Sequence, residues 1–170
     1  MTDFSVVGGV ATIHAPELYE TWIDRPDYIE AVAASPDPEV AATKRTVIEF
    51  EAELARMVRD HAIEERIRDI AERYVAEGYV QHDPNAPGNG REPLIELLRH
   101  TLSHGTPPAV VGVVVEGELA SVLTRQPTPD PLIPDSTYDW YNLEVFRLDN
   151  GRLAEHWGAL QKMAPGKGSM

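Results

Sequence analysis

The spacing of apolar residues changes once along this chain, and that change limits the folds open to it. From Thr43 onward, apolar side chains such as Val47, Phe50 and Leu54 recur at the spacing of an amphipathic helix. From Val110 onward, the period becomes two and β-branched residues predominate, as in strands. A block of helices followed by a block of strands favours an α+β fold over an alternating α/β fold.

The first block predicts three helices. Two amphipathic helices follow Thr43 and break near His61, and Gly78 is expected to end the second as a C-cap glycine. A short strand, 79–81, and an Asn/Gly/Pro-rich loop then precede a third helix over about 91–104. Pro93 fits that helix because it falls in the first turn.

The second block predicts an antiparallel meander. Asn150 and Gly151 favour a two-residue hairpin turn, because Asn-Gly supplies the positive φ angles that such turns require. Four prolines between 126 and 136 predict a loop rather than a strand. The expected strands are 110–115, 119–124, 137–148 and 153–160.

The composition of each segment and the positions of its prolines and glycines predict the domain organisation. Residues 1–42 are rich in proline yet carry Tyr19, Trp22 and Tyr28, so we expect an arm of short helical turns that docks on the domain or on a second subunit. Residues 43–163 form the one domain, and the Gly/Pro-rich segment 164–170 is expected to be a loose tail. Because such an arm is apolar, its removal should lower stability or ligand affinity.

Charge and cysteine content exclude several classes of function. The formal net charge is −13, which argues against nucleic acid and anionic membranes as partners. The chain has no cysteine, so disulfide and thiolate chemistry are excluded. The first residues lack the features of a secretory signal, and the default expectation is a soluble cytoplasmic protein.

Three segments together resemble one family. They are "YVQHDPNAPGNGREPLIELL", "VEGELASVLTR" and "YNLEVFRLDNGRLAEHWGALQ". They are similar to the His-Asn/Asp-Pro turn, the Glu-Gly-Asp-Leu strand and the closing hairpin of SnoaL-like polyketide cyclases, within the nuclear transport factor 2-like superfamily. The resemblance covers about residues 43–162. It implies a cone of three helices packed on a curved antiparallel sheet, with an open mouth, and a homodimer formed through the open face of the sheet.

Glu144 and His82 are the first candidate catalytic residues. Glu144 lies in a strand rich in apolar residues, and by the period of two it faces inward if Phe146 does. Burial would raise the pKa of such a carboxyl and suit it to acid/base work. The alternative is a solvent-facing Glu144 paired with Arg125 or Arg147. His82 leaves a strand beside Asp83, where it could transfer protons or only hold the loop, and Asp83 is expected to form a turn.

His156 and Trp157 form the third candidate element, and hairpin register decides which of them faces Glu144. A two-residue turn pairs Glu144 with Trp157, whereas a three-residue turn with a glycine bulge pairs Glu144 with His156. The sequence leaves both open. With the two-residue turn, Trp157 would line the pocket. With the three-residue turn, Glu144 and His156 would form an acid/base pair.

The remaining site predictions concern the pocket lining and cofactors. Leu123 stands where many members of the resembled family have histidine, which favours an apolar ligand. His82, Glu144 and His156 lack the local spacing of a zinc site, so no metal is expected, and no phosphate-binding loop suggests a nucleotide cofactor. The predicted substrate-binding residues are Tyr79, Leu123, Tyr138, Trp140, Asn142 and Trp157.

Two classes of function are compatible with these residues. One is a cofactor-free enzyme that carries out cyclisation, isomerisation, dehydration or ring opening on a small hydrophobic carbonyl compound of polyketide, terpene or steroid type. In it Glu144 would be the base, and His82 or His156 would polarise or reprotonate the substrate. The other is a non-catalytic ligand-binding or dimerisation module. Because one fold hosts many functions, the resemblance does not choose between them.

Overall fold

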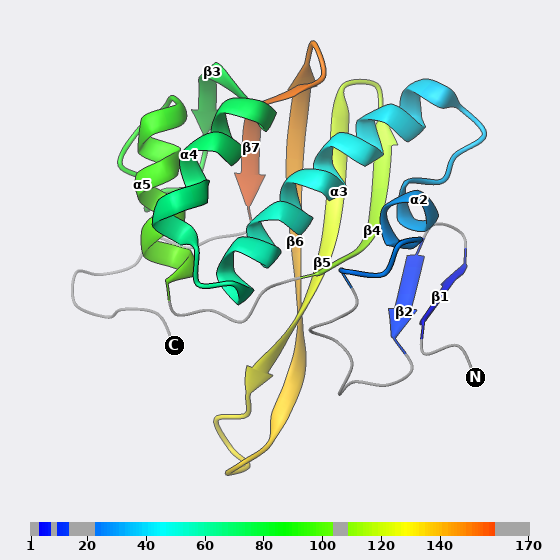
Figure 1. Cartoon of the computed structure of the whole chain (residues 1–170), viewed down its shortest axis with the longest axis vertical. Coiled ribbons are helices and arrows are strands. Elements are labelled where there is room, and N and C mark those ends of the chain that lie inside the picture. Colours follow the sequence, from blue (N-terminus) through cyan, green and yellow to red (C-terminus); the bar gives the residue numbers. More distant parts are fainter. Residues whose placement is uncertain (1–3, 8–9, 14–22, 104–108, 159–170) are drawn as a thin grey trace.

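Helices packed on one face of a curved sheet make up the described structure (Figure 1). The computed structural model describes residues 4–7, 10–13, 23–103 and 109–158. Seven strands follow the spatial order β1-β2-β4-β5-β6-β7-β3. They are β1 (Phe4–Val7), β2 (Val10–Ile13), β3 (Val75–Gln81), β4 (Ala109–Glu116), β5 (Leu119–Pro129), β6 (Thr137–Asp149) and β7 (Arg152–Gly158). The predicted α+β class is confirmed.

One pairing departs from the expected antiparallel sheet. The strand β3 lies beside β7 and runs parallel to it, whereas the other neighbouring strands are antiparallel. The parallel pairing arises because the chain crosses from β3 through a helix and the whole meander before β7 returns beside it. The edge of the sheet nearest α5 is therefore built from two segments far apart in the sequence.

The helices begin and end at recognisable signals. They are α2 (Tyr28–Ala33), α3 (Pro38–Arg59), α4 (Ile63–Tyr74) and α5 (Arg91–Leu102). Asp37 caps α3 by accepting hydrogen bonds from the amides of Glu39 and Val40. His61, at φ 53°, makes the predicted break between α3 and α4.

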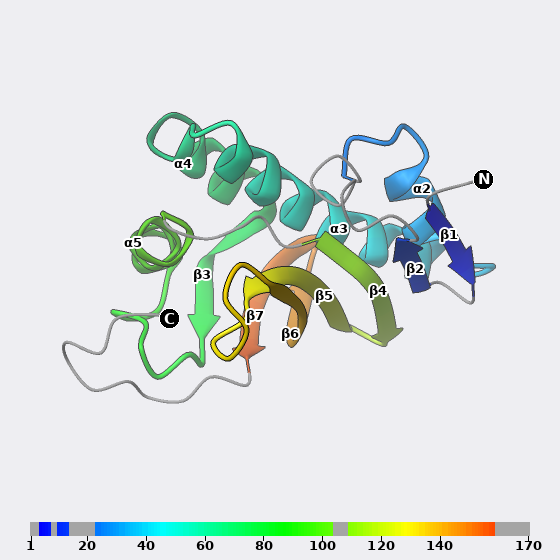
Figure 2. The ribbon, with the colours of Figure 1, turned by 90° about the horizontal axis from the view of Figure 1, so that it is seen from below.

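The core lies between α3 and the inner face of the sheet. Figure 2 shows α3 and α4 above the concave side of the curving strands. Phe50 of α3 makes edge-on contacts with Tyr74 of α4 and Phe146 of β6, with ring centroids 6.1 and 6.3 Å apart. These contacts fix α3 over β6, which matters because both elements carry site residues.

Two boundary predictions are wrong. Gly78 does not cap α4, because this helix ends at Tyr74. The strand β3 begins at Val75, four residues earlier than predicted, so Gly78 lies within it. The proline-rich segment is not wholly a loop, because β5 continues to Pro129 and pairs with β6 as far as Thr137. Figure 1 shows this β5–β6 hairpin extending beyond the helices.

The N-terminal arm contains strands as well as helix. Residues 4–7 and 10–13 form a hairpin rather than helical turns, and Val10 pairs with Gly112 of β4. The α2 helix does dock on the domain: Tyr28 is fully buried, and its hydroxyl donates to the Val110 carbonyl at 2.9 Å. Tyr19 and Trp22 lie outside the described residues, as do residues 159–170.

Candidate active site

A cavity of about 270 Å³ lies between α3, α5 and the concave face of the sheet. Its wall is largely apolar, with leucines of α5 and α3 facing Phe146 and Trp140 of β6. Polar groups gather on the strand side and at Glu51. The lining residues are Phe50, Glu51, Leu54, Tyr79, Gln81, Asp83, Leu94, Leu97, Leu98, Thr101, Leu102, Thr124, Gln126, Trp140, Asn142, Glu144, Phe146 and His156.

Glu144 lines this cavity, as the strand period predicts. Its side chain is 25% exposed, and its Oε1 accepts a hydrogen bond from Asn142 Nδ2 at 2.7 Å. The solvent-facing alternative is wrong, because Arg125 pairs with Asp139 and Arg147 pairs with Glu155. Alternation along β6 thus places Asn142, Glu144 and Phe146 on one face.

The register of the β6–β7 hairpin follows neither expected alternative. The two-residue turn forms, with Asn150 and Gly151 at positive φ and Asp149 opposite Arg152. An irregularity at Ala154 then shifts the pairing by one residue, so that Glu144 lies opposite Gly158 and His156 lies opposite Phe146. Because Phe146 faces inward, His156 does too.

His156 approaches Glu144 diagonally across the two strands. Its Nε2 lies 3.6 Å from Glu144 Oε2, and its ring stacks on Phe146 at 4.7 Å. Its Nδ1 lies 2.9 Å from Gln81 Oε1 on β3. The Nε2 atom is buried and has no hydrogen-bond partner among the described residues. The cavity floor therefore brings the Glu144 carboxylate and a buried imidazole nitrogen close together.

Glu51 is a site residue that the sequence analysis missed. It lies on α3, is only 7% exposed, and lines the cavity beside the strand residues. Burial, and secondarily the negative charge of Glu144, raise the pKa of Glu51 well above its ordinary value of 4.5. Glu51 shares a helical face with Val47 and Leu54, so a carboxyl group inside an apolar stripe was the available signal.

Tyr79 brings a hydroxyl group to the same floor. The residue is 2% exposed, and its oxygen lies 3.4 Å from the Gln81 amide nitrogen, which donates to it. Burial and the charge of Glu144 raise the pKa of the Tyr79 hydroxyl. A neutral phenol that already accepts one hydrogen bond retains its proton to donate to a ligand.

His82 and Trp157 do not line the cavity. The rings of His82 and Trp157 stack at 4.8 Å, and His82 Nε2 lies 2.7 Å from Glu155. Trp157 lies opposite Val145, on the outer face of the sheet. The His82 amide donates to the His156 carbonyl, which ties the loop to β7. The structure thus places His82 where it holds the loop, away from the carboxyl groups of Glu51 and Glu144.

The other predicted lining residues divide between the two faces. Tyr79, Trp140 and Asn142 line the cavity. Leu123 does not line the cavity. It pairs with Leu143, and its neighbours on β5, Val122 and Thr124, take the inner positions. Tyr138 is also outside the lining and 44% exposed, since it lies on the part of the β5–β6 hairpin beyond the cavity.

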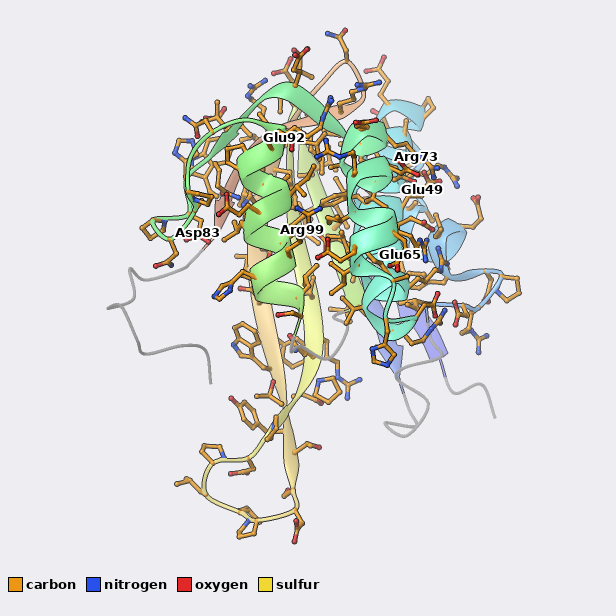
Figure 3. The ribbon with its side chains drawn as sticks, turned by 60° about the vertical axis from the view of Figure 1, so that its left-hand side comes forward. Glu49, Glu65, Arg73, Asp83, Glu92 and Arg99 are labelled. Carbon is orange, nitrogen blue, oxygen red and sulfur yellow. The ribbon has the colours of Figure 1, made fainter. Side chains whose placement is uncertain are left out.

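Asp83 of the loop after β3 and the leucines of α5 line one side of the cavity, and Figure 3 shows this loop beside α5. Asp83 forms the predicted turn, since its Oδ1 accepts from the Asn85 amide at 2.8 Å. Arg99 points from α5 toward α4, and its Nε lies 3.0 Å from Glu64. Glu92 pairs with Arg68 of α4 in the same manner. These ion pairs hold the leucine wall of α5 against the helical layer.

The described residues show neither a metal-binding cluster nor a membrane-spanning helix. Within residues 4–7, 10–13, 23–103 and 109–158, histidine and acidic side chains form no group of three that could bind a metal. In the same residues, every helix is too short or too polar to cross a membrane.

Solved structures share this architecture. A protein provisionally named as a polyketide cyclase from Bacillus cereus is 14% identical, with a TM-score of 0.53 over 70% of this chain and 74% of its own. A second protein of that provisional name, from Acidithiobacillus ferrooxidans, is 18% identical, with a TM-score of 0.52 over 73% and 89%. A nuclear transport factor 2-like protein of unknown function from Mesorhizobium loti is 19% identical, with a TM-score of 0.50 over 75% and 98%.

The chain has a nuclear transport factor 2-like fold. The resemblance of the three sequence segments is therefore confirmed at the level of architecture. Neither a family model nor a curated protein matches the sequence. At these identities a shared fold does not fix a reaction, so the chemistry has to be argued from the cavity.

Proposed function

We propose that the cavity is the active site of a cofactor-free enzyme that moves a proton at carbon beside a carbonyl group. This proposal rests on one observation. Glu144 Oε2 and His156 Nε2 lie 3.6 Å apart at the floor of a largely apolar cavity. A base and a second proton acceptor at this separation can pass a proton between two positions of one substrate. The apolar wall of α5 suits a small hydrophobic substrate.

The two carboxyl groups have different environments and therefore different roles. Glu144 lines the cavity and is oriented by the hydrogen bond from Asn142, so it is placed to act as the base. Glu51, whose pKa is raised by burial, holds its proton more tightly than an ordinary carboxyl group and can donate it to the carbonyl oxygen as negative charge develops there. Tyr79 supplies a second donor from β3. A pair of carboxyl groups separated in this way is an established acid/base arrangement.

Deuterium incorporation tests this function without knowledge of the substrate. Small cyclic ketones are incubated with the protein in D₂O, and exchange at carbon beside the carbonyl is followed by mass spectrometry. Glu144→Gln keeps the shape and hydrogen-bonding of the side chain but removes its basicity. Exchange should fall by about 10²-fold or more, since a positioned acid/base group contributes about 10²–10⁴-fold.

Glu118→Gln is the matched control for this experiment. Glu118 lies in the turn between β4 and β5, with its side chain 73% exposed, and should exchange like the parent protein. If Glu144→Gln exchanges as fast as the parent, Glu144 is not the base. A protein that binds ketones without exchanging their protons would instead be a ligand-binding module of the same fold.

A further inference from the structure

Gln81 occupies a central position among the polar groups of the cavity. It is the last residue of β3, and it pairs with His156 across the parallel β3–β7 contact. Its backbone amide donates to Asn89 Oδ1 at 2.9 Å, and the neighbouring His82 amide donates to the His156 carbonyl at 3.0 Å. The backbones that carry the Gln81 and His156 side chains are therefore fixed against one another.

The orientation of the Gln81 amide follows from its neighbours. Its Oε1 lies 3.1 Å from the Asp83 backbone nitrogen, which can only donate. Its Nε2 lies 3.4 Å from the Tyr79 hydroxyl oxygen. The atom 2.9 Å from His156 Nδ1 is therefore the Gln81 carbonyl oxygen, an acceptor.

This orientation determines which nitrogen of His156 carries the proton. Since Gln81 Oε1 accepts, His156 Nδ1 must donate to it. In the neutral ring, Nε2 then has a lone pair rather than a proton. The lone pair lies 3.6 Å from Glu144 Oε2, which is also an acceptor, and Nε2 has no partner among the described residues. Among the described residues, His156 therefore gives Glu144 Oε2 no hydrogen bond, and this oxygen can accept one from a ligand in the cavity.

We infer that Gln81 is a positioning residue that holds His156 in the Nδ1–H tautomer, so that the site takes carbonyl substrates that also carry a hydroxyl group. The hydroxyl would donate to Glu144 Oε2, to which an Nε2 without a proton cannot donate, while the carbonyl oxygen accepts from Tyr79 and Glu51. This assignment of substrate class rests on the proposed function. The tautomer does not, because it follows from the hydrogen bonds of Gln81 alone.

The tautomer is tested by nitrogen-15 NMR of the histidine side chains in the full-length protein. In the parent protein, His156 should show a protonated Nδ1 and an unprotonated Nε2. Gln81→Met keeps the length of the side chain but removes the amide oxygen, so the preference for the Nδ1–H form should be lost. Gln126→Met is the control, because Gln126 lines the same cavity from β5. It should leave the His156 signals unchanged.

The conservative variant supplies a second readout. Gln81→Glu retains an oxygen acceptor beside Nδ1 and should restore the Nδ1–H form. If Gln81→Met keeps the parent tautomer, or Gln81→Glu loses the Nδ1–H form, Gln81 does not position His156.

Small probes test the substrate class separately. 2-Hydroxycyclohexanone and cyclohexanone differ by one hydroxyl group, and the first should bind at least about tenfold more tightly. It should also shift the His156 Nε2 resonance, and the Gln81→Met variant should lose this preference. Equal affinities would overturn the assigned substrate class. The role of Glu144 in proton exchange would be unaffected, because cyclohexanone exchange measures it independently.

Discussion

Glu51 places an ionisable group where the fold disfavours its charge. Its folded-state pKa is raised, so the folded protein holds this proton more tightly than the unfolded chain does. The contribution of protonated Glu51 to the free energy of unfolding is fully present below pH 4.5, the ordinary pKa of this carboxyl group. It is lost as the pH rises through the folded-state pKa. The loss amounts to about 1.4 kcal/mol for each pKa unit of the shift.

Glu51→Gln should therefore become more stable than the parent as pH rises. Chemical denaturation between pH 4 and pH 9 should show a stability difference that grows above pH 4.5 and levels off at the folded-state pKa. Glu49→Gln, a partly exposed position on the same helix, should show no such growth. A pH-independent difference for Glu51→Gln would mean that the carboxyl is ionised in the folded protein.

At the scale of elements, α2 is the part of the N-terminal arm that stabilises the domain. Tyr28 and Val32 are fully buried, and Tyr28 donates to β4. Deleting residues 1–34 leaves the Asp37 cap of α3 intact and removes both side chains. The free energy of unfolding should fall by about 3 kcal/mol or more, at about 1.5–3 kcal/mol for each large apolar side chain.

This deletion should spare the cavity, because no residue of α2 lines it. Thermal unfolding and binding of a cyclic ketone separate the two effects: the first should change, and the affinity of the folded fraction should not. Full-length Tyr28→Ala should show part of the same loss. A deletion variant with the melting temperature of the parent would show that α2 contributes nothing to stability.

The elements differ in how far local sequence determines them. The apolar period of α3 and the Asn150-Gly151 turn are local, so sequence predicts both. The inward direction of Glu144 follows from strand alternation alone. The irregularity at Ala154 was not predicted from the sequence, and it decides that His156 faces inward. The parallel docking of β3 on β7 joins distant segments, so the contact of Gln81 with His156 has no local signal.

At the scale of the molecule, the outer face of the sheet exposes apolar side chains. Val114, Tyr141 and Leu143 are 72%, 52% and 55% exposed. Because this apolar face is exposed, we expect it to be the interface of a homodimer. A single charge buried in an apolar interface disrupts it, so Leu143→Arg should convert the dimer to a monomer. Light scattering at micromolar concentration measures the change.

Leu132→Arg is the matched control for the dimer. Leu132 is 88% exposed at the tip of the β5–β6 hairpin, away from the outer face at Leu143, and its replacement should leave the dimer intact. A parent protein that scatters as a monomer would contradict the prediction outright. If Leu132→Arg but not Leu143→Arg gives a monomer, the interface lies at the tip of the hairpin.

The place of β3 at the edge of the sheet also has a consequence for how the chain folds. Among the described strands, β3 pairs with β7 alone, and β7 is the last of them in the sequence, so β3 cannot pair until β7 is present. Closing so long a loop is entropically costly, and parallel pairing across it is slow. In pulsed hydrogen exchange during refolding, the amides of β3 should therefore gain protection after those of β5 and β6. The floor of the cavity, where Gln81 lies beside His156, would therefore form after β5 and β6 have paired.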